Sequence, residues 1–276
     1  MHPATQKIQL VEFLGDQTRI RESHVITETP LSLTVNGQAW LTFMCTPVDL
    51  EALAVGFLYN EGLIEKRADL ADVRLCANGD NVDVWLTFPL EKPSDWRRTT
   101  GCTGGVTSVN NEEAASLRPN HHHRYAAAHI YALLDLLNTA QDLYHTSGGV
   151  HTSLLSDGVH KLVAAEDIGR HNTLDKIAGY CFLHELEPEQ RALVTTGRIS
   201  SEMMQKAARL GADLLISRTS PSALSIQIAQ RAGITLIGYA RPRRFLVYTH
   251  PERISGDDMR KTFAISTPST HNGEEG

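Results

Sequence analysis

The sequence predicts a mixed α/β protein, in which a smaller N-terminal α+β unit is followed by a larger α/β unit. Tight-turn signals between alternating apolar residues predict hairpins in the first unit. Strands that alternate with helices predict right-handed βαβ units on a parallel sheet in the second. A chain of 276 residues accommodates one large or two ordinary domains. We place the units at residues 1–115 and 116–265 and expect the polar tail 266–276 to be disordered.

Hairpins organise the N-terminal unit. Apolar and polar residues alternate from 31 to 43 on both sides of Asn36-Gly37, which is a two-residue hairpin signal. A helix is expected next, with Thr46 as its N-cap and Pro47 at its first position. A second hairpin is expected over residues 73–88.

The second unit begins with a helix predicted over residues 125–144, because apolar residues recur there at helical spacing. A hairpin around Asp157-Gly158 follows, and another helix starts near Arg170. Beyond it strands and helices alternate, and the final strand is free to return antiparallel. The expected strands are 192–196, 213–217, 234–239 and 245–248, and the expected helices are 200–210 and 221–232.

Composition limits the classes of function. The formal net charge of -6 disfavours nucleic-acid binding, which usually needs a basic face. No apolar run approaches the length of a membrane span, and the first residues do not resemble a secretory signal. We therefore expect a cytoplasmic protein with reduced thiols, no nucleic-acid partner and no membrane association.

Arginines follow the strands of the second unit. Ligands of open α/β sheets bind at the carboxyl ends of the strands, and two of these loops also run into helix N-termini, which favour anions. A phosphate-bearing ligand is the natural interpretation, although arginines in loops can also simply be solvated or pair with surface carboxylates. Neither a Walker A loop nor a G-x-G-x-x-G after a strand is present, which disfavours an ordinary ATPase or NAD enzyme. The arginines are Arg198, Arg218, Arg241, Arg243 and Arg244.

A second group of polar residues lies where a strand passes into the helix near Arg170. His171 and Asp175 are four residues apart and therefore share a helix face. Either this group is functional or it supplies capping and a surface charge pair. His151, at a strand start, is likewise either a ligand contact or a structural histidine. The group comprises Glu166, Asp167, His171, Asp175 and Lys176.

Cys102 stands in the run Gly-Cys-Thr-Gly-Gly, where an accessible thiol capable of chemistry is expected. Cys45, Cys76 and Cys181 lie in or beside apolar elements and are expected to be packing residues or bystanders. The run 121–123 is three adjacent histidines without a spaced partner, so we read it as part of a linker.

These motifs together resemble the FdhD/NarQ family, the formate dehydrogenase accessory sulfurtransferases. The resemblance extends from the Asn36-Gly37 hairpin to Arg253, nearly the whole chain outside the tail. The segments that carry it are Gly101-Cys102, Gly149-Val-His151, Glu166-Asp-x-Gly-Arg-His-Asn-x-x-Asp-Lys176, Thr196-Gly-Arg-x-Ser-x-Glu-Met203 with Lys206, and Tyr248-Thr-His-Pro-Glu-Arg253.

The resemblance implies a three-layer α/β/α second domain similar to the cytidine deaminase fold, without zinc. It implies a carrier that takes sulfur from a cysteine desulfurase and passes it to the bis(molybdopterin guanine dinucleotide) form of the molybdenum cofactor before insertion into formate dehydrogenase. Cys102 falls on the family's persulfide cysteine. The segment of Tyr239, Ala240, Arg241, Pro242, Arg243 and Arg244 falls on the cofactor-binding loop, where a guanine nucleotide is also expected to fit.

Further cofactor contacts are expected from Arg198, Arg218, His151, His171 and Lys176, and no metal ligands are expected. One position departs from the family pattern, because Gly105 stands where a second loop cysteine is typical. A single persulfide cysteine is chemically sufficient. The departure keeps open one alternative, a non-catalytic chaperone for the cofactor in which Cys102 is dispensable. A further alternative is a hydrolase using His171 with Asp167 or Asp175. The roles of Glu166, Asp167 and Asp175 and the oligomeric state, with a homodimer as one option, also stay open.

Overall fold

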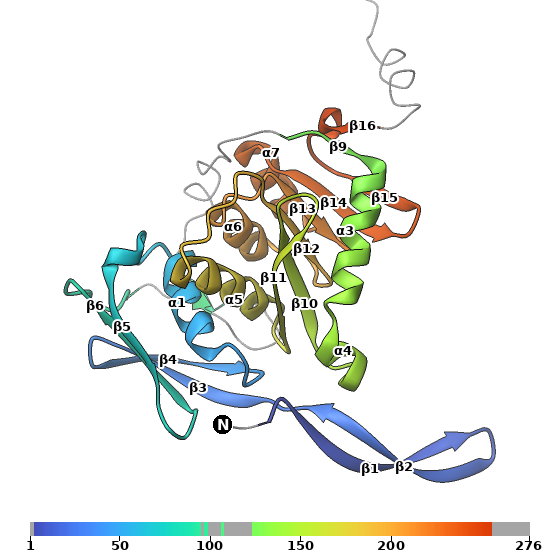
Figure 1. The fold of residues 1–276 in the computed structure, drawn as a ribbon, viewed down its shortest axis with the longest axis horizontal. Helices are drawn as coiled ribbons and strands as arrows, with labels where there is room; N and C mark the ends of the chain where they lie inside the picture. Colours follow the sequence, from blue (N-terminus) through green and yellow to red (C-terminus); the bar gives the residue numbers. More distant parts are fainter. Residues whose placement is uncertain (1–2, 95–96, 99–105, 108–122, 256–276) are drawn as a thin grey trace, which may run out of the picture.

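A six-stranded mixed sheet forms the centre of the computed structural model, which describes residues 3–94, 97–98, 106–107 and 123–255. Its strand order is β11-β10-β12-β13-β14-β15 (Figure 1). Strands β12 to β14 run parallel, as the alternation of strands and helices predicts, and β10, β11 and β15 complete the sheet in antiparallel pairs. The strands are β10 His151–Ser156, β11 Lys161–Asp167, β12 Ala192–Thr195, β13 Leu214–Ser217, β14 Thr235–Arg241 and β15 Arg244–Val247.

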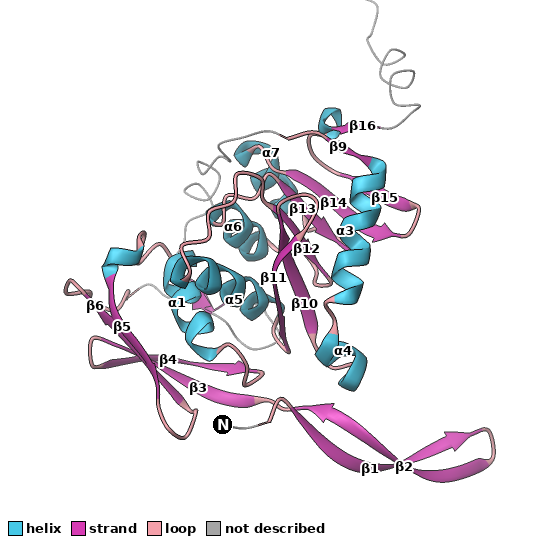
Figure 2. Ribbon diagram, viewed as in Figure 1, coloured by secondary structure: helices cyan, strands magenta, loops and turns pink. Residues whose placement is uncertain are grey.

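Helices cover both faces of this sheet, which makes three layers (Figure 2). On one face α3 (Ala127–Thr139) buries Ile130 and Leu133 against β-strand side chains such as Val194. On the other face lie α5 (Arg170–Leu183), α6 (Ser201–Arg209) and α7 (Ala223–Ala232), packed on a separate apolar cluster. The expected helix-sheet-helix arrangement is therefore present in the described residues.

The N-terminal hairpins join into one four-stranded sheet of order β4-β3-β6-β5. The Asn36-Gly37 turn has positive φ at both residues, 47° and 80°, as a tight hairpin with the right-handed strand twist requires. Helix α1 packs on this sheet through a third apolar cluster that also takes in Phe182 of α5. The elements are β3 Thr29–Val35, β4 Gln38–Cys45, α1 Leu50–Asn60, the short 3-10 helix η1 Arg67–Asp69, β5 Leu70–Leu75 and β6 Asn81–Leu86.

Helices α1 and α5 cross at backbone contact because each places a glycine at the crossing. A Cβ on Gly56 would lie 1.8 Å from the Asp175 carbonyl oxygen, and one on Gly179 would lie 1.8 Å from the Ala52 carbonyl oxygen. No other residue fits at either position without moving the helices apart. This crossing fixes the N-terminal sheet against the α/β sheet.

The structure corrects the predicted start of α1. Its N-cap is Asp49, so Thr46 and Pro47 precede the helix. Thr46 is used elsewhere: its backbone N–H donates to Asp167 Oδ2 at 3.0 Å, and its Oγ1 accepts from the Ile168 N–H at 3.2 Å. These contacts between distant segments hold Thr46 out of the helix.

The helix predicted over 125–144 is also divided. A short strand, β9 (Tyr125–Ala126), precedes α3, and α4 (Asp142–Ser147) follows after a break at Ala140 and Gln141. Buried Gln141 donates its side-chain amide to Thr152 Oγ1 at 3.4 Å, which turns the chain between the helices. The remaining short elements are β7 Arg97–Arg98, β8 Val106–Thr107, the 3-10 helix η2 Pro251–Arg253 and β16 Ile254–Ser255, which pairs with β9.

A hairpin that the sequence analysis did not identify precedes all of these elements. Strands β1 (Thr5–Leu14) and β2 (Gln17–Ile26) form a separate two-stranded ribbon, drawn in dark blue in Figure 1, that extends away from both sheets. Within the described residues, no helix combines the length and the apolar character needed to cross a bilayer.

Candidate functional site

One edge of the six-stranded sheet collects the polar ends of its strands. The carboxyl ends of β11 to β14 meet there with the amino ends of β10 and β15, as the pairs His151 with Asp167 and Arg241 with Arg244 show. Helices α5, α6 and α7 begin at the same edge because they follow β11, β12 and β13. Their first N–H groups and positive dipole ends make this strand-end edge favourable for an anion.

The arginine-bearing loops converge on this edge, as the sequence predicts. Arg198 follows β12, Arg218 follows β13, and the others belong to the turn between β14 and β15. All are exposed except Arg218, which is half-buried. Five guanidinium groups therefore surround one edge of a chain whose net charge is -6.

Hydrogen bonds join these loops to one another. The Arg218 N–H donates to the Thr195 carbonyl at 3.1 Å, and the Tyr239 N–H donates to the Thr219 carbonyl at 3.0 Å. Arg241 Nη1 donates to the carbonyl oxygens of Arg218 and Ala240. The guanidinium of Arg241 thus connects the β14–β15 turn to the loop after β13, so the edge is a continuous surface rather than separate loops.

The predicted cofactor-binding segment forms a tight turn. Tyr239 is exposed and has a φ of 49° at an irregularity in the β14–β15 ladder, whereas Ala240 is buried in the core. Pro242 and Arg243 form the turn itself, and Arg243 has a φ of 65°. The side chains of Tyr239 and the arginines are therefore open to a ligand, while Ala240 offers only its backbone.

Hydroxyl groups that the sequence analysis did not single out fix the loop after β12. Ser153 Oγ donates to Thr195 Oγ1 at 2.8 Å, and Thr195 Oγ1 in turn accepts from the Gly197 N–H at 3.1 Å. Ser217 Oγ donates to the Gly197 carbonyl at 2.7 Å. Serine and threonine at successive strand ends are the sequence signal that could have identified these residues. These hydrogen bonds fix the backbone of Gly197 and thereby the position of Arg198, the next residue.

The two histidines lie at this edge in a positive environment. Burial is the largest cause that lowers the pKa of His151, and the positive charges of Arg170 and Arg198 lower it further. His151 Nδ1 lies 3.3 Å from Thr196 Oγ1. The pKa of His171 is lowered to about 2, mainly by burial and further by the positive charges of Lys206 and Arg170. Both rings are consequently neutral at pH 7, and each can donate one hydrogen bond and accept another.

The hydrolase arrangement of His171 with Asp167 or Asp175 is not formed. His171 Nε2 lies 3.3 Å from Ser200 Oγ and 3.3 Å from Glu202 Oε2. Because the two contacts use the same nitrogen, they do not constitute a nucleophile-histidine-acid relay, in which each ring nitrogen has its own partner.

The carboxylate of Asp167 has a structural role. It pairs with Lys176 Nζ at 2.7 Å and also accepts from the backbone N–H groups of Thr46 and Gly169 and the side chain of Asn172. Lys176 is 1% exposed, and its ammonium also donates to the carbonyl oxygens of Thr46 and Glu166. These contacts use all three ammonium protons of Lys176, which favours an internal role over the predicted contact with a cofactor.

Glu166 and Asp175 are also engaged within the protein. Glu166 accepts from the Leu143 and Tyr144 N–H groups at the start of α4, at 2.6 and 3.1 Å. Asp175 accepts from Lys206 Nζ at 2.6 and 2.7 Å. The acidic residues of the 166–176 motif thus position helices, and the arginines and the half-buried His151 are left to face a ligand. His171, predicted as a cofactor contact, is only 5% exposed, and its Nε2 is engaged by Ser200 and Glu202.

The predicted sulfur-carrying residue, Cys102, lies outside the described residues, and so does Gly105. The described backbone nearest to them in sequence is β7 and β8, which pair antiparallel with Arg98 opposite Val106. Burial raises the pKa of Cys45 to about 12 and that of Cys181 to about 11, so both are protonated thiols at pH 7. Cys76 donates its thiol to Asp80 Oδ1 at 2.9 Å. These contacts suit the expectation that the three cysteines are not nucleophiles.

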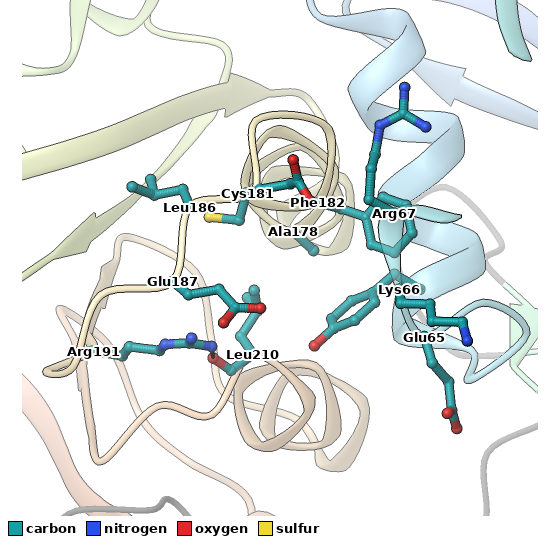
Figure 3. Close-up of a pocket in the computed structure, with 12 residues that line it drawn as sticks. Glu65, Lys66, Arg67, Ala178, Cys181, Phe182, Leu186, Glu187, Arg191 and Leu210 are labelled. Carbon is teal, nitrogen blue, oxygen red and sulfur yellow. Dashed lines mark hydrogen bonds between the residues drawn. The ribbon is translucent and has the colours of Figure 1, made fainter. Parts of the chain in front are cut away.

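A cavity of about 340 Å³ lies at the opposite end of the helices, where α5 and α6 finish (Figure 3). Tyr59, Cys181 and Arg191 line it, and the Arg191 guanidinium is held by the carbonyl oxygens of Pro188 and Leu210. It is therefore separate from the strand-end edge.

Among the described residues, His, Cys, Asp and Glu side chains form no group of three or more that could hold a metal ion. His123, which we read as part of a linker, contacts the α/β unit: its Nδ1 lies 2.8 Å from Asp213 Oδ2. Tyr125 donates its hydroxyl to the other oxygen of the same carboxylate at 3.0 Å. The start of this unit is thereby fixed to β13.

Comparison with known families identifies the chain. The model of the FdhD/NarQ family matches residues 26–255. This chain belongs to the FdhD/NarQ family. The match includes Cys102 and the whole strand-end edge but excludes most of the β1–β2 ribbon.

Relatives of this family member include the "Sulfur carrier protein FdhD" of Staphylococcus aureus strain MRSA252, which is 35% identical over 234 residues, covering 83% of this chain and 88% of the relative. The protein of the same name from strain bovine RF122 is 34% identical over the same shares. A similar solved structure is described as a formate dehydrogenase accessory protein from Desulfotalea psychrophila. Its TM-score is 0.78 and its sequence identity 30%, and the match covers 92% of this chain and 100% of that chain.

Proposed function

We propose that this FdhD/NarQ member is a sulfurtransferase that carries sulfur as a persulfide on Cys102 and delivers it to the molybdenum cofactor before formate dehydrogenase receives it. The observation that supports the site is the convergence of Arg198, Arg218 and the arginines of the β14–β15 turn on one sheet edge. The relatives named as sulfur carriers and the neighbour named as a formate dehydrogenase accessory protein support the reaction.

The strand-end edge suits a cargo that contains guanine dinucleotides. Phosphates bind well to guanidinium groups, which donate two parallel hydrogen bonds, and to helix N-termini. Arg198, Arg218, Arg241, Arg243 and Arg244 would contact phosphates. The half-buried, neutral His151 would supply a hydrogen bond and the exposed Tyr239 a stacking surface, while the buried His171 would act from behind through Ser200. In this proposal bis(molybdopterin guanine dinucleotide) is a bound substrate, and guanosine diphosphate is a fragment able to occupy the same edge.

Sulfur loading needs only one thiol. The Cys102 thiolate attacks the outer sulfur of a persulfide on a cysteine desulfurase; the donor S–S bond breaks, and the donor cysteine leaves as a thiolate. In the second step the Cys102 S–S bond breaks, the outer sulfur bonds to the molybdenum of the cargo, and the Cys102 thiolate is regenerated. The sulfur leaves the persulfide as a neutral sulfane atom, so a reduced molybdenum centre of the cargo must supply the two electrons that convert it to a sulfide ligand. The glycines around Cys102 in the sequence permit close approach to both partners. Both partners, and a cytoplasmic location where thiols stay reduced, are part of this proposal.

A second candidate function is a chaperone that only holds the cofactor for formate dehydrogenase. Gly105 favours it, because the family's usual second loop cysteine is missing here. In that case the arginines of the edge would be essential and Cys102 would be dispensable.

Intact-mass measurement tests the proposal. The protein is incubated with a cysteine desulfurase and cysteine, and the expected result is a gain of one or more sulfur atoms that dithiothreitol removes. Cys102→Ala should abolish this gain, while Cys76→Ala, as the matched control, should retain it. A gain that persists in Cys102→Ala, or no gain in the wild type, contradicts the carrier function.

Formate dehydrogenase activity in cells distinguishes the two candidates. A carrier predicts loss of activity both with Cys102→Ala and with the combined Arg241→Ala and Arg244→Ala change. A chaperone predicts normal activity with Cys102→Ala and loss only with the arginine variant.

A further inference from the structure

The cavity where α5 and α6 finish has an apolar wall. Its volume of about 340 Å³ is at the lower end of the range for ligand pockets, so it suits a small molecule rather than a dinucleotide. Tyr59 and Cys181 are half-buried and the other wall residues are buried, so an apolar group placed there is shielded from water. The wall residues are Tyr59, Ala178, Cys181, Phe182 and Leu210.

The charged residues that line this cavity balance one another. Three of them are carboxylates and three are cationic, so a ligand without net charge suits the cavity better than an anion or a cation. Figure 3 shows Glu187 and Arg191 on one side of the cavity and Glu65, Lys66 and Arg67 on the other. Glu187 and Arg191 form no ion pair with each other or with another described residue, so both charges are available to a ligand.

Arg191 is held in position to bind a carboxylate. Its Nε donates to the Pro188 carbonyl at 3.0 Å and its Nη1 to the Leu210 carbonyl at 2.8 Å. These bonds use two of the five N–H groups of a guanidinium, and the remaining three are sufficient for a carboxylate. Because the side chain is already fixed, little of its rotational freedom is lost when a ligand binds.

Glu187 supplies the opposite charge in the same loop, four residues before Arg191. Burial is the largest cause that raises the pKa of Tyr59, and the charges of Arg191 and Glu187 both act on the same hydroxyl, which places both near the wall. The negative dipole ends of α5 and α6 also lie here and favour a cation. An ammonium group is therefore stabilised on the Glu187 side of the cavity.

We propose that this cavity binds a free α-amino acid with an apolar side chain. The ligand carboxylate bonds to Arg191, its ammonium group bonds to Glu187, and its side chain contacts the apolar wall. An α-amino acid carries both charges on neighbouring atoms and is neutral as a whole, which matches the balanced lining. A phosphate ester or a dicarboxylate has no ammonium group for Glu187.

Calorimetric titration of the full chain with L-leucine tests the proposal. Wild type should bind with a Kd at or below about 1 mM. Glu187→Gln removes one charge from an exposed position and should weaken binding at least about tenfold. Glu189→Gln, which is exposed in the same loop but does not line the cavity, is the matched control and should bind like wild type. Both variants should keep the wild-type circular dichroism and melting temperature.

Analogues of leucine test the two charged contacts from the ligand side, which leaves the structural bonds of Arg191 intact. N-acetyl-L-leucine lacks the ammonium group and L-leucinamide lacks the carboxylate, so each should bind wild type at least about tenfold more weakly than L-leucine. Glu187→Gln should not weaken the binding of N-acetyl-L-leucine further, because that contact is already absent. Saturating guanosine diphosphate should leave the affinity for L-leucine unchanged, since the strand-end edge lies at the other end of the helices.

The proposal is wrong if the wild-type Kd for L-leucine exceeds about 1 mM, or if Glu187→Gln binds L-leucine as tightly as wild type. Equal affinity for L-leucine and either analogue would also overturn it. Displacement of L-leucine by guanosine diphosphate would place the amino acid at the strand-end edge and would contradict a separate site.

Discussion

Replacing Asp167 by Asn should substantially lower the free energy of unfolding, although the two side chains have nearly the same shape. The carboxylate is 0% exposed, and it is the charged partner of Lys176, which is 1% exposed. Asparagine keeps the volume but removes the charge, so the Lys176 ammonium remains buried without a counter-ion. Its amide nitrogen would also face a backbone donor, either Thr46 N–H at 3.0 Å or Gly169 N–H at 2.8 Å.

Breaking a buried ion pair by removing one partner costs about 3–5 kcal/mol. At roughly 2–4 °C per kcal/mol for a domain of this size, the melting temperature should fall by about 6–20 °C. Urea and thermal unfolding followed by circular dichroism measure both quantities. Asp135→Asn, on the exposed surface of α3, is the matched control and should stay within about 0.5 kcal/mol of wild type.

A loss of less than about 1 kcal/mol in Asp167→Asn would refute the assignment of Asp167 and Lys176 to a buried structural pair. Guanosine diphosphate affinity, measured well below the melting temperature, should remain that of wild type because neither residue faces the strand-end edge through a free polar group. An unchanged melting temperature with lost nucleotide binding would instead place Asp167 and Lys176 in the ligand site.

Three further outcomes follow from the geometry. Gly179→Ala should destabilise by about 3 kcal/mol in urea unfolding, because its Cβ would meet the Ala52 carbonyl at 1.8 Å; a neutral effect would contradict the close crossing. His171 has a depressed pKa when folded, so the unfolded chain binds a proton that the folded chain excludes, and the unfolding free energy should fall by about 1.4 kcal/mol between pH 7.5 and 5.5. His171→Gln should remove that part of the pH dependence and His160→Gln should not; equal slopes would argue against a buried neutral ring. Glu166→Ala should cost about 1–2 kcal/mol and increase amide exchange in α4, and unchanged exchange there would exclude its capping role.

Local sequence signals predicted the elements whose causes are themselves local. The Asn36-Gly37 turn needs positive φ at both residues, and few residue pairs other than Asn-Gly provide it cheaply. The alternation of apolar strands and helices likewise predicted the parallel pairing of β12, β13 and β14. The convergence of the arginine loops then followed from topology alone, since carboxyl ends of parallel strands meet at one edge.

Elements set by contacts between distant residues could not be predicted in the same way. Thr46 and Asp167 are 121 positions apart, and only the folded structure shows that their hydrogen bond takes Thr46 out of the helix. In the sequence Lys176 is a candidate phosphate ligand because its side chain is cationic. In the folded structure it is buried beside the Asp167 carboxylate. The break before α4 depends on Gln141 and Glu166, whose partners belong to other elements.

Calorimetric titration with guanosine diphosphate tests the central claim that the strand-end edge holds the guanine dinucleotide part of the cargo. Wild type should bind, and the combined Arg241→Ala and Arg244→Ala change should weaken binding by about 10- to 100-fold, since each guanidinium-phosphate contact is a charge-assisted bond. Arg231→Ala, on the far end of α7, should bind like wild type. Equal affinity in the wild type and the Arg241, Arg244 variant would contradict the account.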